Sequence, residues 1–350
     1  MPVVQLKVPQ AWRVGRVTFR PPGWLATHAD LNAADSDLAT VQFLEWAREG
    51  IEGHSASTAE VRVRWPEKET QPTIDAAIEN VRDSIAVLLL YQHARYPTLN
   101  RDVQQFGVHG DIGATAWRFT VTERRRILVA GHHWLGIIGD WEFSRDDVRA
   151  FRTDPRFAYL DRALRTSPLR RTEFQRRAIM AVRSCSLATP MLREQLRVVL
   201  LATALEALLS AEVSPGGRHE RGEFFRIAQR ASYLFCGEPD HRYPSRPPCP
   251  YLHAKSERAL TRALEERAKR GEQPVCSYFW HVFDLLQDRN DALHSARERF
   301  GHRRLSWHAI TTEQVILYAL EWANVRGAST LSELQAEFDG FVQAGTAVSP

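Results

Sequence analysis

YFWHVFDLLQDRNDALHSARE, residues 278–298, begins as an apolar segment and ends as a polar one. Seven of its first nine residues are apolar or aromatic, whereas the later part carries Arg289, Asn290 and His294. A helix anchored by the apolar part would hold a permanent cation and a titratable imidazole at fixed positions. Chemistry on a phosphate group needs both, because one stabilises negative charge and the other transfers a proton. We therefore expect this segment to carry the functional site.

Helical periodicity extends outward from this segment, from Leu169 to about Gly327, and strand patterns are missing there. The sequence predicts helices over 169–187, 192–211, 223–235, 255–270 and 307–325, with a proline-rich loop at 239–250. Ser306 is a candidate N-cap of the last helix, and Gly327 follows its end. Residues 168–330 are thus predicted to form an all-α bundle, followed by a C-terminal tail at 331–350.

The first half of the chain has a mixed pattern. Alternation of apolar and polar residues predicts strands near 12–19, 59–65, 116–122, 127–130 and 134–143. Helical spacing from Pro72 to about Ala94 predicts one long helix, and 38–49 is a second candidate. We expect residues 1–165 to form an α+β domain, in which the long helix packs on an antiparallel sheet. The composition changes near Arg165, which places the domain boundary there.

Composition bounds the classes of protein. A length of 350 residues favours two domains, and 44% hydrophobic with 25% charged residues is typical of a soluble globular protein. The net charge of +4 fits an anionic partner, although a coding sequence rich in arginine codons would give the same balance. We find no signal peptide, and the apolar run Ile85–Tyr91 is too short to span a bilayer. We expect a cytoplasmic protein without a membrane partner.

Several kinds of site are disfavoured. The chain lacks the phosphate-binding loop of ATPases, the dinucleotide fingerprint, the zinc-protease motif and the nucleophile elbow of hydrolases. None of the four cysteines forms a C-x-x-C pair, which favours free thiols over a zinc site. His132 and His133 are neighbours in a predicted strand and would point to opposite faces. We expect no metal and no cofactor, and no constellation supports an independent enzyme in the first half.

Glu206 is the only charged residue between Val198 and Leu209, in a segment that is apolar on nearly every helical face. Such a helix is usually buried, and a buried carboxylate needs a cationic or hydrogen-bonding partner. Arg289 and Arg230 are the candidate partners. Alternatively, Glu206 lies where the helix meets solvent. We expect it to have a supporting role rather than a direct chemical one.

The spacing within the motif limits how it could work. Asn290 lies four residues before His294 and shares its helical face. Arg289 lies five residues before His294, roughly 140° away around an ideal helix. One copy would converge only if the helix bends or the histidine sits at its C-terminal margin. Two copies facing each other across a dimer axis would bring both residue types together.

Three helical segments carry a family resemblance: Ala-Leu-Glu-Ala-Leu-Leu at 204–209, Ala-Gln-Arg-Ala-Ser-Tyr-Leu-Phe at 228–235, and Leu-Leu-Gln-Asp-Arg-Asn-Asp-Ala-Leu-His-Ser at 285–295. Together they resemble the HEPN superfamily, in particular its ApeA-like branch, over about 168–327. Arg289, Asn290 and His294 match its R-x(4–6)-H motif, and Glu206 matches its acidic position. Ser295 departs from the glycine common in this branch.

The resemblance implies a metal-independent endoribonuclease that acts as a homodimer through its helical domain. Such enzymes act in anti-phage abortive infection or as toxins, so a phage-derived trigger or an antitoxin is an expected partner beside RNA. By the same analogy the first domain is a sensor or targeting domain. The alternative is a HEPN-like module that binds RNA, a nucleotide or a protein without cutting. Arginines that could line an RNA path, or simply form solvated helix faces, are Arg176, Arg177, Arg303 and Arg304.

Overall fold

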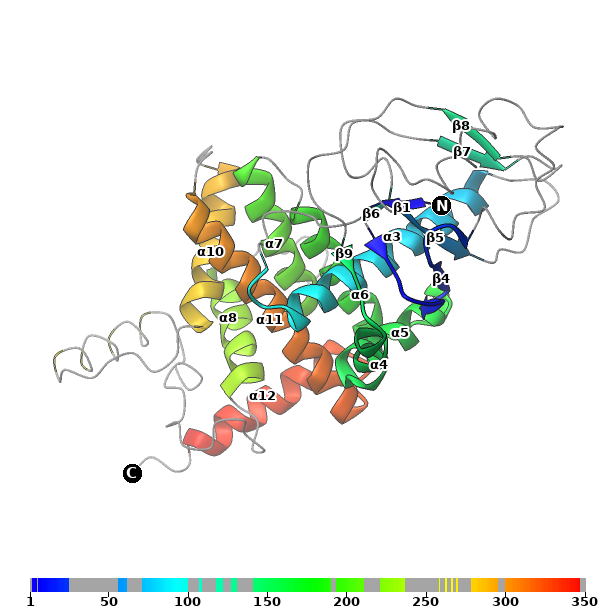
Figure 1. The fold of residues 1–350 in the computed structure, drawn as a ribbon. Helices are drawn as coiled ribbons and strands as arrows, with labels where there is room; N and C mark the ends of the chain where they lie inside the picture. The colour runs from blue at the N-terminus through cyan, green and yellow to red at the C-terminus, as the bar shows by residue number, and fades with distance from the viewer. Residues whose placement is uncertain are drawn as a thin grey trace, which may run out of the picture. The chain divides into compact units, whose positions relative to one another are not determined.

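The computed structural model describes residues 2–4, 6–24, 56–61, 71–99, 107–108, 118–121, 127–130, 141–189, 193–210, 221–236, 278–294 and 300–346, and the single positions 258, 262, 266 and 269. Some predictions lie wholly or mostly outside these residues: the helices at 38–49 and 255–270, the strand residues 62–65 and 134–140, the proline-rich loop and His132–His133. The chain divides into two compact units, Met1–Ser167 and Pro168–Pro350 (Figure 1).

The first unit contains a mainly antiparallel sheet, as predicted. Its neighbouring strands, in spatial order, are β3 (Trp12–Val14), β4 (Val17–Arg20), β5 (Ala56–Val61), β1 (Pro2–Val4) and β6 (Gly107–Val108). Each of these pairs runs antiparallel, and Trp12 faces Phe19 across the β3–β4 hairpin. The short strand β2 (Leu6–Lys7) pairs in parallel with β5 and with β9 (Trp141–Glu142). Strands β7 (Arg118–Val121) and β8 (Ile127–Ala130) form a separate antiparallel pair.

Helix α3 (Gln71–Arg95) contacts β4, β5 and β6 and supplies much of the core of this unit. Its residues Val81 and Leu88 are fully buried, and the hydroxyl of Ser84 donates to the carbonyl of Val14 at 3.1 Å. The alternation of β3 and β4 buries Trp12 and Phe19 completely, and Trp12 contacts Tyr91 of α3 with ring centroids 6.1 Å apart. The α+β architecture predicted for the first half is therefore confirmed.

Two further helices, α4 (Arg145–Thr153) and α5 (Pro155–Arg165), close this unit and were not predicted. Ser144 and Asp147 form a capping box at the start of α4. Asp154 ends α4 and caps α5, whose first residue is Pro155. Burial would raise the pKa of Asp147, but hydrogen bonds from Ser144 and from the hydroxyl of Tyr96 outweigh it and lower the pKa below its usual value.

The second unit consists of packed helices in the part of the chain that is described, as predicted. They are α6 (Glu173–Ala188), α7 (Glu194–Leu209), α8 (Arg221–Cys236), α10 (Tyr278–His294), α11 (His302–Arg326) and α12 (Leu331–Thr346), after a short 3-10 turn η2 (Pro168–Arg170). Helix α7 contacts α6, α8, α10 and α11, which explains why its sequence is apolar on nearly every face. None of the helices among the described residues is long and apolar enough to cross a membrane.

Two helix boundaries differ from the predictions. Helix α6 begins at Glu173 rather than Leu169, because Thr172 and Gln175 form a capping box. Helix α11 begins at His302, so Ser306 lies inside it and is not its N-cap; Gly301 holds that position with φ 83°. The predicted end is confirmed, since Gly327 adopts the left-handed conformation after the last turn.

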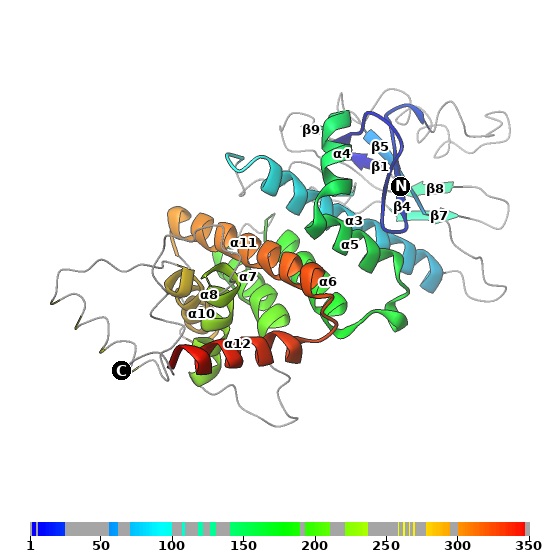
Figure 2. The ribbon, with the colours of Figure 1, turned by 90° about the horizontal axis from the view of Figure 1, so that it is seen from below.

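Residues 331–346, predicted to belong to a C-terminal tail, instead form α12, which lies across one end of α8 (Figures 1 and 2). Leu331, Leu334 and Phe338 follow helical spacing and are buried. Glu337 accepts hydrogen bonds from the hydroxyl of Tyr233 at 2.9 Å and from the indole of Trp322 at 3.1 Å. The prediction of a tail is wrong because α12 packs on α8, distant in sequence, where Phe338 contacts Tyr233 with ring centroids 5.7 Å apart.

Candidate functional site

Helix α10 carries the predicted motif at its C-terminal end. Its first turns are anchored in the bundle, with Phe279, Val282 and Leu286 buried against α7, α8 and α11. The last helical residue is His294, which is exposed. Burial decreases along the helix, so the apolar part holds the polar end at the surface.

The first turn of α7 ties the end of α10 to the start of α11. The side-chain amide of Gln195 donates to the carbonyl of Ala292 at 2.5 Å, one of the last carbonyls of α10 that lack an intrahelical partner. The carboxylate of Glu194 accepts from the backbone N–H of Phe300 at 2.6 Å and of Gly301 at 3.2 Å. Because helix N-termini attract negative charge, this contact also stabilises α11. The first turn of α7 therefore contacts both the last turn of α10 and the start of α11.

Arg289 forms an ion pair with Glu206 of α7, with 3.6 Å between Nη2 and Oε2. Its Nη1 also donates to Oδ1 of Asn290 at 3.2 Å. Both members of the pair are only partly exposed, 20% for Arg289 and 15% for Glu206. Of the two partners considered for Glu206, the structure thus selects Arg289, and the carboxylate orients the guanidinium.

Arg230, the other candidate, serves a different purpose. It is buried, and its Nη1 donates to the carbonyl of Leu209 at 2.6 Å and pairs with Glu223 at 3.3 Å. Burial lowers the pKa of Arg230, and Glu223 partly offsets this effect. Arg230 therefore joins α8 to the C-terminal end of α7, where a cation is favourable.

The structure brings Arg289, Asn290 and Glu206 together and leaves His294 one turn further along. Helix α10 runs without interruption from Tyr278 to His294. His294 is the last residue of the helix, and roughly 140° of helical rotation separates it from Arg289. Within the described residues no hydrogen bond joins His294 to Arg289.

Sequence reasoning missed Asp288, which links α10 to α11 beside the motif. This carboxylate is 1% exposed and accepts from Arg304 Nη2 at 2.9 Å and contacts Nε2 of His308 at 2.8 Å. Burial would raise its pKa, but the hydrogen bonds from His308 and Arg304 outweigh burial and lower it. A signal was present: Asp288 lies three residues after Leu285 and four before Ala292, in the buried row of α10.

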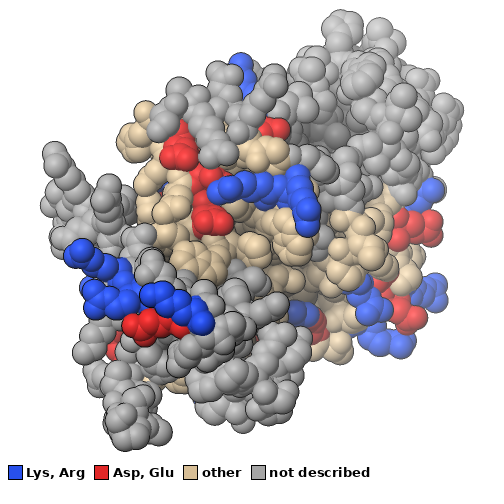
Figure 3. Space-filling view, turned by 90° about the vertical axis from the view of Figure 1, so that its left-hand side faces the viewer, with Lys and Arg blue, Asp and Glu red and all other residues tan. Residues whose placement is uncertain are grey.

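The four arginines assigned to an RNA path have different surroundings. Arg177 is 16% exposed, pairs with Glu173 at 2.6 Å and donates to the carbonyls of Ala207 and Ser210. Arg304 pairs with Asp288. Arg176 and Arg303 are exposed, and Arg176 donates to the carbonyl of Arg171. On the face shown in Figure 3, the basic side chains of the described residues lie in small groups with acidic side chains beside them.

Replacing Asp288 by asparagine is expected to lower the free energy of unfolding by about 1–3 kcal/mol at neutral pH, because buried His308 loses its charged partner. A carboxylate with a lowered pKa stabilises the fold above its unfolded pKa, near 3.9, and this contribution disappears as the pH falls through the folded pKa. Thermal unfolding from about pH 7 to pH 3 should therefore show a shallower decline for Asp288→Asn than for the wild type. The control is Asp339→Asn at an exposed position, which should follow the wild type. If the unfolding temperature of Asp288→Asn fell with pH as steeply as that of the wild type, the role of Asp288 would be contradicted.

The comparisons leave the family open: no protein-family model, no curated protein and no solved structure matches the chain. Among the described residues, no three histidine, cysteine, aspartate or glutamate side chains lie close enough together to hold a metal ion. Cys185 on α6 is buried and forms no disulfide within the described part of the chain. The site is therefore judged from its own geometry and chemistry.

Proposed function

We propose that this protein is a cytoplasmic endoribonuclease that cleaves RNA without a metal ion, as its resemblance to the HEPN superfamily implies. The observation that carries the proposal is the oriented Arg289 guanidinium, held by Glu206 at 3.6 Å and by Asn290 at 3.2 Å on the helix that ends at exposed His294. A cation in a fixed position stabilises charge without reorganising during the reaction.

Each residue has a role in the transesterification. His294 takes the proton from an RNA 2′-hydroxyl, or donates one to the departing 5′-oxygen. The 2′-oxygen forms a bond to the adjacent phosphorus while the bond from phosphorus to the 5′-oxygen breaks. Arg289 binds the phosphate and stabilises its additional negative charge. The products are a 2′,3′-cyclic phosphate and a 5′-hydroxyl end, and Asn290 binds the phosphate or orients the imidazole.

A homodimer completes this site. Arg289 and His294 lie on different faces of α10, so a second copy supplies the facing residue. Two exposed apolar side chains accompany the motif, Leu293 on α10 (50% exposed) and Leu196 on α7 (45% exposed). Each is next in sequence to a residue of the Gln195–Ala292 contact, and exposed apolar groups of this kind favour association. We place the activity in abortive infection or toxicity, controlled by a trigger or an antitoxin through the first unit.

The test is an RNA cleavage assay with purified protein in excess EDTA, followed by identification of the product ends. We expect cleavage with cyclic phosphate and 5′-hydroxyl ends. Products with a 5′-phosphate, or cleavage that EDTA abolishes, would contradict the mechanism. Tight RNA binding without any product after long incubation would instead support the non-catalytic binding module.

Substituting Glu206 by glutamine keeps its shape and removes its charge. We expect a loss of cleavage of at most about tenfold, because partly exposed ion pairs contribute about 1 kcal/mol or less and Asn290 still contacts Arg289. The loss should appear in kcat rather than in KM if Glu206 positions Arg289 for the transition state. The matched control is Glu223→Gln, whose carboxylate serves Arg230. Equal losses in both variants would indicate a purely structural effect.

A further inference from the structure

Two ion pairs hold helix α10 at consecutive residues beside and within the motif. Asp288 pairs with Arg304 of α11, whereas Arg289 pairs with Glu206 of α7. An α-helix has 3.6 residues per turn, so neighbouring side chains leave it about 100° apart. The two pairs therefore run to different neighbouring helices, and α10 packs against both of them. The same turn of α10 is thus held from two sides.

Asp288 forms the tighter of the two pairs. Arg304 donates to both of its carboxylate oxygens, from Nε to Oδ2 at 2.5 Å and from Nη2 to Oδ1 at 2.9 Å. Nε2 of His308 contacts the same Oδ2 at 2.8 Å, and both Asp288 and His308 are buried. Nδ1 of His308 has no hydrogen-bond partner in the part of the chain that the structure describes, so Asp288 orients this ring. Paired bonds to a charged carboxylate are strong and directional.

The same contacts limit what else Arg304 does. Its side chain is 41% exposed, but Asp288 occupies both Nε and Nη2. A phosphate that took these donors would leave the buried Asp288 with His308 alone, and removing one partner of a buried ion pair is strongly unfavourable. The contacts of Arg304 therefore favour a role toward α10 over a contact with RNA.

The rotation of α10 about its own axis decides where the residues of the motif point. Side chains extend about 5–6 Å from the axis of an α-helix, so a rotation of about 10° displaces them by about 1 Å. A displacement of about 1 Å can lower the rate of catalysis roughly 10²-fold. Asp288 lies directly before Arg289 and six residues before His294. A contact that prevents rotation at Asp288 therefore acts on both motif residues.

We propose that Arg304 and His308 are positioning residues of the motif: they hold Asp288 and thereby fix the rotation of the last turns of α10, which carry Arg289 and His294. This inference rests on the proposed ribonuclease function. It moves Arg304 from the RNA path to the support of the site. Neither Arg304 nor His308 touches RNA in this arrangement, and their effect on cleavage passes through Asp288.

The variant Arg304→Gln tests the proposal, because it removes the charge and the paired donors and keeps a polar side chain. At saturating RNA in EDTA, we expect the single-turnover rate to fall about tenfold or more, since the motif loses its fixed orientation. The affinity for RNA and its dependence on salt should stay those of the wild type, because no phosphate contact is lost. Arg304→Lys keeps the charge and loses the paired geometry, so its rate should lie between the two.

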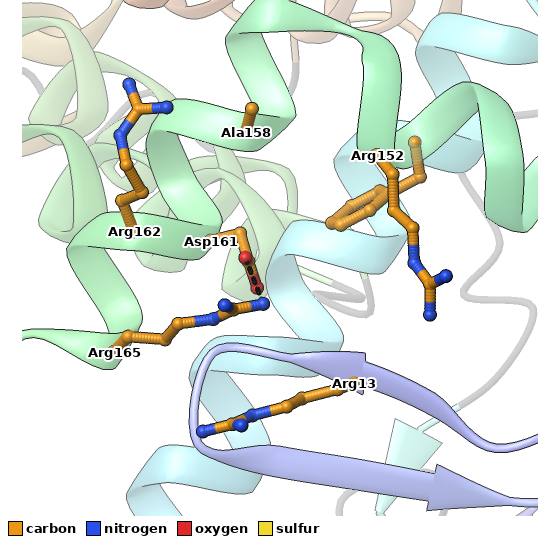
Figure 4. A pocket seen from close by; sticks show the side chains of 7 residues that line it. Arg13, Arg152, Ala158, Asp161, Arg162 and Arg165 are labelled. Carbon is orange, nitrogen blue, oxygen red and sulfur yellow. Dashed lines mark ion pairs between the residues drawn. The ribbon is translucent and has the colours of Figure 1, made fainter.

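Two arginines with similar exposure and similar ion pairs serve as matched controls. Arg326 lies on the same helix, is 43% exposed and pairs with Glu337 at 3.1 Å. Arg165 lies in the first unit, is 48% exposed and pairs with Asp161 at 2.6 Å (Figure 4). Arg326→Gln and Arg165→Gln should cleave RNA at the wild-type rate. An equal loss of rate in Arg304→Gln and in either control would show general destabilisation and would overturn the proposal.

A direct contact between Arg304 and RNA would give a different result. Arg304→Gln would then bind RNA more weakly at an unchanged saturated rate. The slope of log K against log salt concentration would become shallower by about 0.7, the contribution of one phosphate on a single strand. That result would overturn the proposal, and so would a variant whose rate and affinity both equal those of the wild type.

Hydrogen exchange separates this proposal from the proposed function, since it needs neither RNA nor cleavage. The backbone amides of residues 289–294 should exchange faster in Arg304→Gln than in the wild type or in Arg326→Gln, because the last turns of α10 open more readily. If the wild type cleaves no RNA, the ribonuclease function fails, and faster exchange still shows that Arg304 holds this segment. Unchanged exchange would overturn the proposal in either case. Circular dichroism excludes misfolding, and Arg304→Lys takes the same measurements if glutamine unfolds the protein.

Discussion

Replacing His294 by alanine is expected to lower the rate of RNA cleavage about 10²–10⁴-fold, the usual contribution of a positioned acid or base. His294 is exposed at the last position of α10, so its removal leaves no cavity in the core. The unfolding temperature should therefore remain that of the wild type, and RNA binding should weaken much less than cleavage. Single-turnover rates measured in EDTA, together with binding measurements, separate these quantities.

The matched control is His281→Ala on the same helix. His281 stacks on Trp307 with ring centroids 5.4 Å apart and lies more than three turns before His294. This variant should cleave RNA at nearly the wild-type rate. Full cleavage by His294→Ala, or equal losses in both variants, would refute the role assigned to His294.

The same variants test the shared site. Arg289→Ala and His294→Ala proteins are each expected to be inactive alone. When the two are mixed, a dimer of one copy of each retains one intact Arg289 and one intact His294 on opposite subunits, so part of the activity should return. A mixture that stays inactive although mixed dimers form would mean that both residues must come from one chain.

Deletion of residues 331–350 is expected to destabilise the second unit severely. Helix α12 buries Leu331, Leu334 and Phe338, and each fully buried apolar side chain contributes roughly 1.5–3 kcal/mol. Its removal would also take Glu337 from the buried hydroxyl of Tyr233 and the indole of Trp322. The expected loss, roughly 5–9 kcal/mol, is comparable with the whole stability of a typical domain. Circular dichroism at 222 nm during heating should show the helices of this unit largely unfolded at room temperature.

Two variants locate the source of this effect. Deletion of residues 347–350 alone, which lie outside the described part of the chain, should leave the unfolding temperature unchanged. Glu337→Gln should cost about 1–3 kcal/mol, since it weakens the contacts with Tyr233, Trp322 and Arg326 without removing apolar area. If the 331–350 deletion unfolds at the wild-type temperature, α12 is not part of the folded core.

Much of the architecture follows from local patterns in the sequence. Alternation in residues 12–19 predicts the short strands that bury Trp12 and Phe19, and the apolar run around Glu206 predicts the central helix α7. The pairing of the two strands as a hairpin was not predicted. The paired helices α4 and α5 were missed although their start signals were present. Ser144 and Asp147 form a capping box, and Asp154 precedes a proline. Helix α4 has nine residues, and Val148 and Phe151 are its buried apolar side chains, so its apolar pattern is short.

The sequence determines which residues form the motif, their order on α10 and their separation around the helix, because helical spacing is a local property of the backbone. The partners of these residues are not. In the sequence, Arg289 and Arg230 were equally good candidate partners for Glu206. The packing of α7 against α10 and α8 decides between them: Arg289 pairs with Glu206, and Arg230 pairs with Glu223. Likewise, Asp288 became a buried link to His308 only when α11 covered it. Ion pairs depend on distances of a few ångströms between segments far apart in the chain, and only the folded packing sets those distances.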